Sequence, residues 1–132
     1  MSEVARALVA SPVKSAQIAA EELRKTYEWV PVEEAEQIVA LGGDGFMLQT
    51  LHAMLENHRI LPVFGMNLGT LGFLMNHWRP DGLMERLARA KPFAVTPLVM
   101  DAVTVDGENF VLPAINEVSM LRETRQTAKL EV

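Results

Sequence analysis

A carboxylate among three glycines is the first feature of this sequence that could do chemistry. The stretch 42–45 reads Gly-Gly-Asp-Gly and directly follows the apolar run 38–41. Glycines after a buried strand let the backbone approach a ligand, and the next helix offers free N–H groups and partial positive charge to a phosphate. A carboxylate would repel that phosphate, so Asp44 suggests a proton acceptor, a hydroxyl anchor or a metal contact. The structural alternative is an N-cap for a helix that begins near Phe46.

Two common phosphate-binding motifs do not describe this turn. A dinucleotide fingerprint would need a third glycine three residues after Gly45, where Leu48 stands. A P-loop would need Gly-Lys followed by Ser or Thr, which the sequence lacks. The sequence therefore predicts a phosphate-binding turn of another kind.

Two further polar segments could complete a nucleotide site. The stretch 65–74 holds three glycines together with short polar side chains such as Asn67, and Phe73 could stack on a base. Asn116 and Glu117 interrupt an apolar run, and an adjacent amide and carboxylate can hold the hydroxyls of a ribose. Each segment has an ordinary alternative, because Phe73 could be a core residue and the Asn-Glu pair could simply end a strand.

Other reactive side chains give weaker indications. The three histidines, at positions 52, 58 and 77, lack the spacing of a metal-binding motif. No serine lies in a nucleophile elbow, and there is no cysteine to act as a nucleophile. The residues alone therefore leave any metal ligand unassigned.

The elements that must position these residues alternate between strands and helices. Short apolar runs are typical of buried strands, and apolar residues three and four apart are typical of helices that cover a sheet. The expected strands are 7–10, 38–41 and 60–64, and the expected helices are 15–26, 47–55 and 83–88. This alternation with short links predicts an α/β fold, a parallel sheet with flanking helices.

The pattern changes after Pro97. Two runs rich in β-branched residues flank Asp106 and Gly107, a pair that tolerates the positive φ angles of a tight two-residue hairpin turn. Further strands are expected over 114–120 and 128–132.

These runs suggest two domains. We expect an α/β nucleotide-binding domain over 1–97 and the beginning of a β-rich second domain over 98–132, whose remainder is absent. Strand edges left without partners readily pair with other chains, so we expect either a homo-oligomer joined through residues of roughly 98–132 or disorder there, and self-association is the cheaper outcome.

Composition excludes several kinds of partner. The chain has 132 residues, with 12 Lys and Arg against 17 Asp and Glu, a net charge of −5. This balance gives no basic footprint for nucleic acid or for an anionic membrane. The lack of cysteine fits a reducing compartment, and no stretch reads as a signal peptide or a membrane span. We therefore expect a cytoplasmic protein with no nucleic-acid partner and no membrane partner.

Three motifs together resemble the NAD kinase family in identity, order and spacing. They are Leu-Gly-Gly-Asp-Gly at 41–45, Gly-Met-Asn-Leu-Gly-Thr-Leu-Gly-Phe-Leu at 65–74 and Ala-Ile-Asn-Glu-Val at 114–118. The resemblance covers essentially the whole chain and is to bacterial members. It implies transfer of the γ-phosphoryl group of ATP, or of inorganic polyphosphate, to the 2′-hydroxyl of the adenosine ribose of NAD, giving NADP. A divalent metal, usually magnesium, assists this reaction in the family.

The resemblance also implies roles for residues of the first motif. Asp44 would accept the proton of the 2′-hydroxyl, which agrees with the need of a weak nucleophile for a positioned base. Gly42, Gly43 and Gly45 would lie near the phosphates. Many members carry Thr directly after this motif, where this chain has Phe46.

For the other two motifs, the resemblance implies that Phe73 lies against the adenine. It also implies that Asn116 and Glu117 bind NAD through its ribose hydroxyls. Two alternatives stay open. The diacylglycerol and sphingosine kinase group also uses Gly-Gly-Asp-Gly, although the 65–74 loop and the Asn-Glu pair favour a dinucleotide acceptor. A non-catalytic nucleotide-binding fragment would keep the fold and lose turnover.

Overall fold

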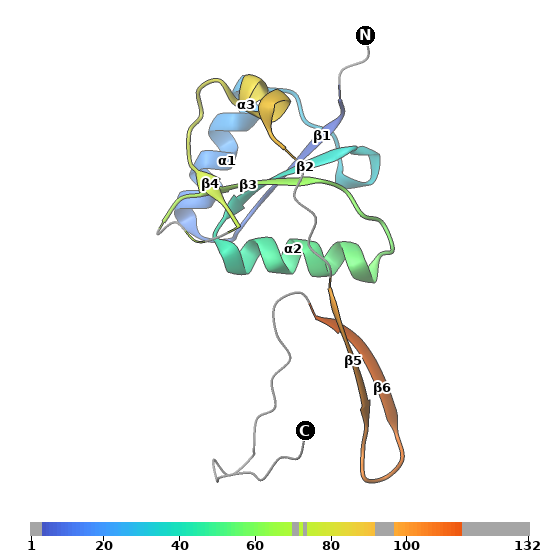
Figure 1. Cartoon of the computed structure of the whole chain (residues 1–132). Coiled ribbons are helices and arrows are strands. Elements are labelled where there is room, and N and C mark those ends of the chain that lie inside the picture. Colours follow the sequence, from blue (N-terminus) through green and yellow to red (C-terminus); the bar gives the residue numbers. More distant parts are fainter. Residues whose placement is uncertain (1–3, 70–71, 73, 92–96, 115–132) are drawn as a thin grey trace. The chain divides into compact units, whose positions relative to one another are not determined.

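A computed structural model of the chain describes residues 4–69, 72, 74–91 and 97–114 (Figure 1). The chain divides into two compact units, 1–95 and 96–132.

The first unit is built on a parallel sheet, as the sequence predicts. Its strands are β1 (Arg6–Ala10), β2 (Gln37–Gly42), β3 (Val63–Asn67) and the two-residue β4 (Asn76–His77). They lie side by side in this order, and each neighbouring pair is parallel. The sheet and the helices that flank it confirm the α/β class.

Helices cover both faces of this sheet. The helix α1 (Lys14–Thr26) and the short α3 (Leu83–Arg89) pack on one face, and α2 (Asp44–Glu56) lies on the other (Figure 1). A single 3-10 turn, η1 (Val32–Glu34), lies within the segment that joins α1 to β2. All three predicted helices are present, and their bounds differ from the predicted ones by at most a few residues.

Small side chains bring α1 close to the sheet. Its buried residues are Ala16, Ala19, Ala20 and Leu23. Three of the four are alanines, and they share one buried cluster with Val39, Leu41 and Met66 of the sheet. The strand β2 has a neighbour on each side and helices over both faces, which explains why 38–41 is apolar without alternation.

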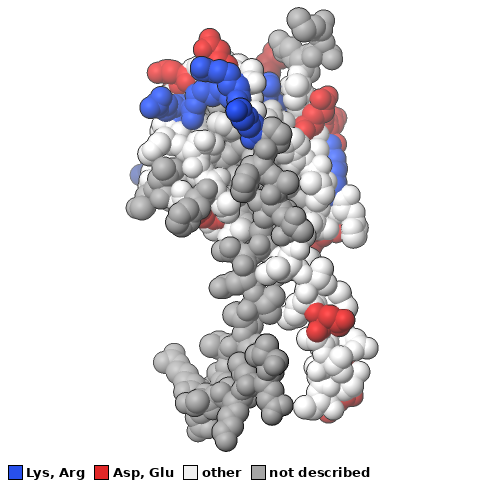
Figure 2. Space-filling view, viewed as in Figure 1, with Lys and Arg blue, Asp and Glu red and all other residues white. Residues whose placement is uncertain are grey.

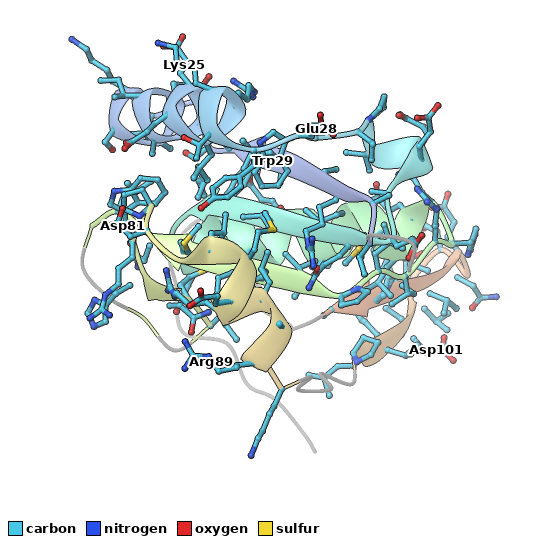
Figure 3. All side chains as sticks on the ribbon, turned by 90° about the horizontal axis from the view of Figure 1, so that it is seen from above. Lys25, Glu28, Trp29, Asp81, Arg89 and Asp101 are labelled. Carbon is cyan, nitrogen blue, oxygen red and sulfur yellow. The ribbon has the colours of Figure 1, made fainter. Side chains whose placement is uncertain are left out.

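The link that follows α1 is fixed by an indole. Trp29 Nε1 donates a hydrogen bond to the carbonyl of Leu23 at 3.0 Å, and its ring meets Tyr27 edge to face, with centroids 6.5 Å apart. Figure 3 shows Trp29 beside the end of α1. The segment 27–36, which has no clear period in the sequence, is therefore held by specific side-chain contacts.

The third strand is displaced from its predicted position. The sequence indicates 60–64, whereas β3 runs from Val63 to Asn67 and therefore includes part of the glycine-rich stretch. A Cβ on Gly65 would overlap the ends of the Met47 and Met75 side chains, so a larger residue there would have to displace them. The prediction was wrong because a glycine in a buried strand looks like a loop residue in the sequence.

The second unit contains an antiparallel hairpin of β5 (Leu98–Val103) and β6 (Asn109–Ala114). The predicted two-residue turn is wrong. Thr104 N donates to the carbonyl of Glu108 at 2.8 Å, which leaves three residues, 105–107, in the loop. Of these only Gly107 has a positive φ, of 87°. The strands expected beyond residue 114 lie outside the described residues.

One face of this hairpin is entirely apolar. Cross-strand pairs Leu98 with Ala114, Met100 with Leu112 and Ala102 with Phe110 share it. Several of these side chains are exposed, with Phe110 at 45% and Leu112 at 52%. Within the described part of the chain, no helix is long and apolar enough to cross a membrane.

Candidate functional site

The carboxyl ends of the strands of the first unit form one edge, where the polar motifs meet. Gly42 at the end of β2 is the register partner of Asn67 at the end of β3, and Asn67 is the partner of His77 in β4. Parallel α/β sheets bind ligands outside the carboxyl ends of their strands. This edge is therefore the candidate site, and it is where the sequence motifs predict one.

Asp44 stands at the point where β2 passes into α2. It is the first residue of the helix, and the N-cap is Gly43, whose backbone is extended. The structural alternative, in which Asp44 caps a helix that begins near Phe46, is therefore wrong. Asp44 Oδ1 instead accepts a hydrogen bond from the backbone N–H of Leu74 at 3.1 Å. The carboxylate is tied to the loop after β3 rather than to its own helix.

The glycines around Asp44 differ in their surroundings. A Cβ added at Gly43 or at Gly45 would meet no described atom within 4 Å, so the backbone there is open to a ligand. A Cβ on Gly42 would lie 2.9 Å from Cβ of Phe46, because that ring packs over the end of β2. Gly43 and Gly45 therefore fit the expected approach of phosphates, whereas Gly42 is required by packing.

Asn67 shapes the loop that reaches Asp44. Its side chain is 8% exposed, and Oδ1 accepts the N–H of Gly69 at 2.7 Å, which turns the chain immediately after β3. Its carbonyl accepts the N–H of Trp78 at 3.2 Å. The sequence marks Asn67 only as a short polar group. The spacing Asn-x-Gly is the signal that predicts such a turn.

Gly72 crosses directly over the Asp44 carboxylate. The three atoms nearest to a Cβ built on Gly72 are Cγ, Oδ1 and Oδ2 of Asp44. A side chain at residue 72 would overlap that carboxylate. Sequence reasoning had no means to assign this contact, because the two residues lie in separate motifs.

Some predicted site residues cannot be placed. Phe73, Asn116 and Glu117 lie outside the described residues. For the ranges that are described, no three His, Asp or Glu side chains gather where they could hold a metal ion. The structure therefore brings together Asp44, its glycines and the loop after β3.

Arg86 was missed by the sequence analysis and supports this edge from α3. Its guanidinium donates to the carbonyls of His77 and Arg79, at 3.1 Å each, and so ties β4 and the turn that follows it to the helix. The motif-based reading had no signal for it, because an arginine on a surface helix looks like a solvated charge.

Arg86 also lines a shallow cavity of about 590 Å³, with Trp78, Asp81 and Arg89 among its walls. Figure 2 shows basic side chains gathered over α3 with acidic ones beside them. Asp81 precedes this helix, and Arg89 is its last residue (Figure 3). The mixture of both signs favours a solvated surface over an anion site.

Comparison with known families agrees with this geometry. The family model described as the ATP-NAD kinase N-terminal domain matches residues 3–90. The match covers β1 through α3 and therefore the whole candidate edge.

Curated relatives are similar over almost the whole chain. The NAD kinase of Rhizorhabdus wittichii is 66% identical over 132 residues, which are 100% of this chain and 51% of the relative. The NAD kinase of Zymomonas mobilis is 68% identical over 125 residues, which are 95% of this chain and 48% of the relative. The NAD kinase of Rhizobium meliloti is 47% identical over 126 residues. The chain thus spans about half the length of the curated relatives it matches.

Proposed function

Because the chain belongs to the NAD kinase family, we propose that it forms part of an enzyme that phosphorylates NAD. The reaction moves the γ-phosphoryl group of ATP, or a phosphoryl group of polyphosphate, to the 2′-hydroxyl of the adenosine ribose, and NADP is the product. The O–P bond to the leaving phosphate breaks as the bond from the 2′-oxygen to phosphorus forms, and the hydroxyl proton passes to a base.

The observation that carries this proposal is the position of Asp44. Its carboxylate lies at the carboxyl edge of the sheet, at the first residue of α2, and is held by the N–H of Leu74. A secondary hydroxyl is a poor nucleophile, and a positioned general base typically contributes about 10²- to 10⁴-fold to such a reaction. Asp44 is the residue of this edge that is suited to accept the proton.

The phosphates would lie against the start of α2. Gly43 and Gly45 leave the backbone open there, and the first helical turn offers N–H groups and partial positive charge. A magnesium ion in phosphoryl transfer is usually held by substrate phosphates, water and one or two carboxylates, and it neutralises charge that develops on the phosphates. Among the described residues of this edge, Asp44 is the carboxylate that would contact such an ion.

The acceptor would be held by the other two motifs. We propose that Phe73 lies against the adenine and that Asn116 and Glu117 bind the ribose hydroxyls of NAD. Support for this comes from the motifs and from the family, since these residues lie outside the described ranges. The same motifs favour a dinucleotide acceptor over a lipid acceptor.

Location and assembly are part of the same proposal. A chain without cysteine suits a reducing cytoplasm. We propose that residues 98–132 begin a β-rich domain and that copies associate through the apolar face of the β5–β6 hairpin. The exposed side chains of that face support this, because an isolated two-stranded hairpin is only marginally stable in water.

An NADP-formation assay tests the function directly. The chain would be assayed with NAD, ATP and magnesium, alone and as a chimera in which it replaces the matching part of the Rhizorhabdus wittichii enzyme. We expect turnover by the chimera. A folded chimera that hydrolyses or binds ATP but forms no NADP would contradict the proposal, and phosphorylation of a lipid alcohol instead would favour the lipid kinase alternative.

A further inference from the structure

We infer that Gly72 is a positioning residue that keeps the Asp44 carboxylate in the orientation needed for proton transfer. This inference rests on the proposed function, in which Asp44 is the base. It assigns a role in the same reaction to a second residue, from a separate motif. That role depends on residue 72 having no side chain.

Residue 72 has no room for a side chain beside Asp44. A Cβ built there would lie 2.6 Å from Oδ1 of Asp44 and still closer to the other atoms of the carboxyl group, whereas real Cβ atoms essentially never come within 3.0 Å of a heavy atom. The φ angle of Gly72 is outside the left-handed region. The need for glycine therefore comes from the neighbouring carboxylate and not from the local backbone conformation.

Leu74 fixes the direction in which the Asp44 carboxylate points. Two residues after Gly72, its N–H donates to Oδ1 of Asp44 at 3.1 Å. Backbone contact limits how far the carboxylate can swing toward the loop, and the hydrogen bond fixes how one oxygen points. The Cα of Asp44 is itself fixed by the first turn of α2.

The loop that makes these contacts is anchored at both ends. Asn67 turns the chain as it leaves β3, through its hydrogen bond from the N–H of Gly69. At its other end the loop leads into β4, where Asn76 and His77 pair with Met66 and Asn67 of β3. Anchoring at these two ends matters, because misplacing a reacting group by about 1 Å can cost about 10²-fold in rate.

Gly69 supplies a matched control in the same loop. A Cβ there would approach its nearest described neighbour, Oδ1 of Asn67, at 3.8 Å, which is ordinary contact. The Gly72→Ala and Gly69→Ala variants therefore remove the same backbone freedom, but only the first places a methyl group against Asp44.

The first experiment is a double-variant cycle in the chain itself. The thermal midpoint of unfolding would be measured for Gly72→Ala in the wild-type background and in an Asp44→Ala background, where the carboxylate is gone. We expect Gly72→Ala to lower the midpoint clearly in the first background and by less than half as much in the second. Gly69→Ala should shift it by the same small amount in both backgrounds.

The same variants can be compared at one backbone amide, that of Leu74. Hydrogen exchange of the Leu74 amide should be accelerated by Gly72→Ala and by Asp44→Ala, and it should be little changed by Gly69→Ala. An equal loss of stability in both backgrounds, a double variant that fails to fold, or unchanged exchange at Leu74 would each overturn the inference.

Kinetics then connect the contact to the reaction. In the chimera with the Rhizorhabdus wittichii enzyme, Gly72→Ala should lower kcat at least about tenfold while KM for ATP changes by less than about threefold. A kcat within threefold of the parent would overturn the inference. If Asp44→Asn leaves kcat unchanged, the assignment of the base fails, and the stability cycle still decides whether residue 72 orients the carboxylate.

Discussion

Arg86 places its guanidinium over the ring of Phe64, with Cζ 5.6 Å from the ring centroid. This contact joins α3 to the middle of β3, and the same guanidinium holds the carbonyls of His77 and Arg79. One side chain on a seven-residue helix thus ties together the strands that carry the loop above Asp44.

Removal of this guanidinium should destabilise the first unit. Arg86→Met keeps the aliphatic stem and the helix propensity but loses two hydrogen bonds to carbonyls, a weaker one to Met66 Sδ and the ring contact. We therefore expect a loss of about 1–3 kcal/mol in unfolding free energy. Chemical denaturation measures this change in unfolding free energy. Arg89→Met on the same helix is the control, because Arg89 is exposed, and an equal loss in both variants would refute a specific role for Arg86.

Asn116 should discriminate between the two substrates. Asn116→Ala removes polar contacts to a ribose hydroxyl, so NAD affinity in the chimera should weaken by about 1–3 kcal/mol while ATP affinity stays nearly unchanged. Titration calorimetry with each nucleotide measures both affinities. Equal weakening for NAD and ATP would mean that Asn116 does not belong to the NAD site.

The hairpin predicts how copies associate. Phe110→Lys places a charge on the apolar face shared by Met100 and Leu112, and it should convert an oligomer to a monomer. Val111→Lys on the opposite face is the matched control and should leave the oligomer intact. Size-exclusion chromatography with light scattering measures the oligomeric state. A monomeric wild-type chain, or association that persists in both variants, would contradict the proposal.

Sequence patterns predicted the sheet and its helices because those elements bury continuous or periodic apolar faces. The strand 38–41 and the alanine-rich helix that precedes it are recognisable from such patterns alone. The position of β3 was not recognisable, because Gly65 makes room for the ends of Met47 and Met75, and those contacts join residues of separate segments.

The candidate site likewise has a part that the sequence predicts and a part that it does not. Asp44 could be predicted from its own motif, since a carboxylate among glycines after a strand is unusual. Its contacts with Gly72 and Leu74 could not, because they depend on how the loop after β3 folds back over the start of α2. The role of Arg86 depends likewise on the return of α3 onto the sheet.

The most direct test of the whole account is the turnover number of Asp44→Asn in the chimera. The amide keeps the size of the carboxylate and can still accept the N–H of Leu74, but it cannot take up the proton of the 2′-hydroxyl. NADP formation should therefore fall at least about 10²-fold in kcat, with modest change in KM for NAD and ATP. Near-normal turnover in this variant would contradict the account and leave Asp44 as an anchor of the loop rather than the base.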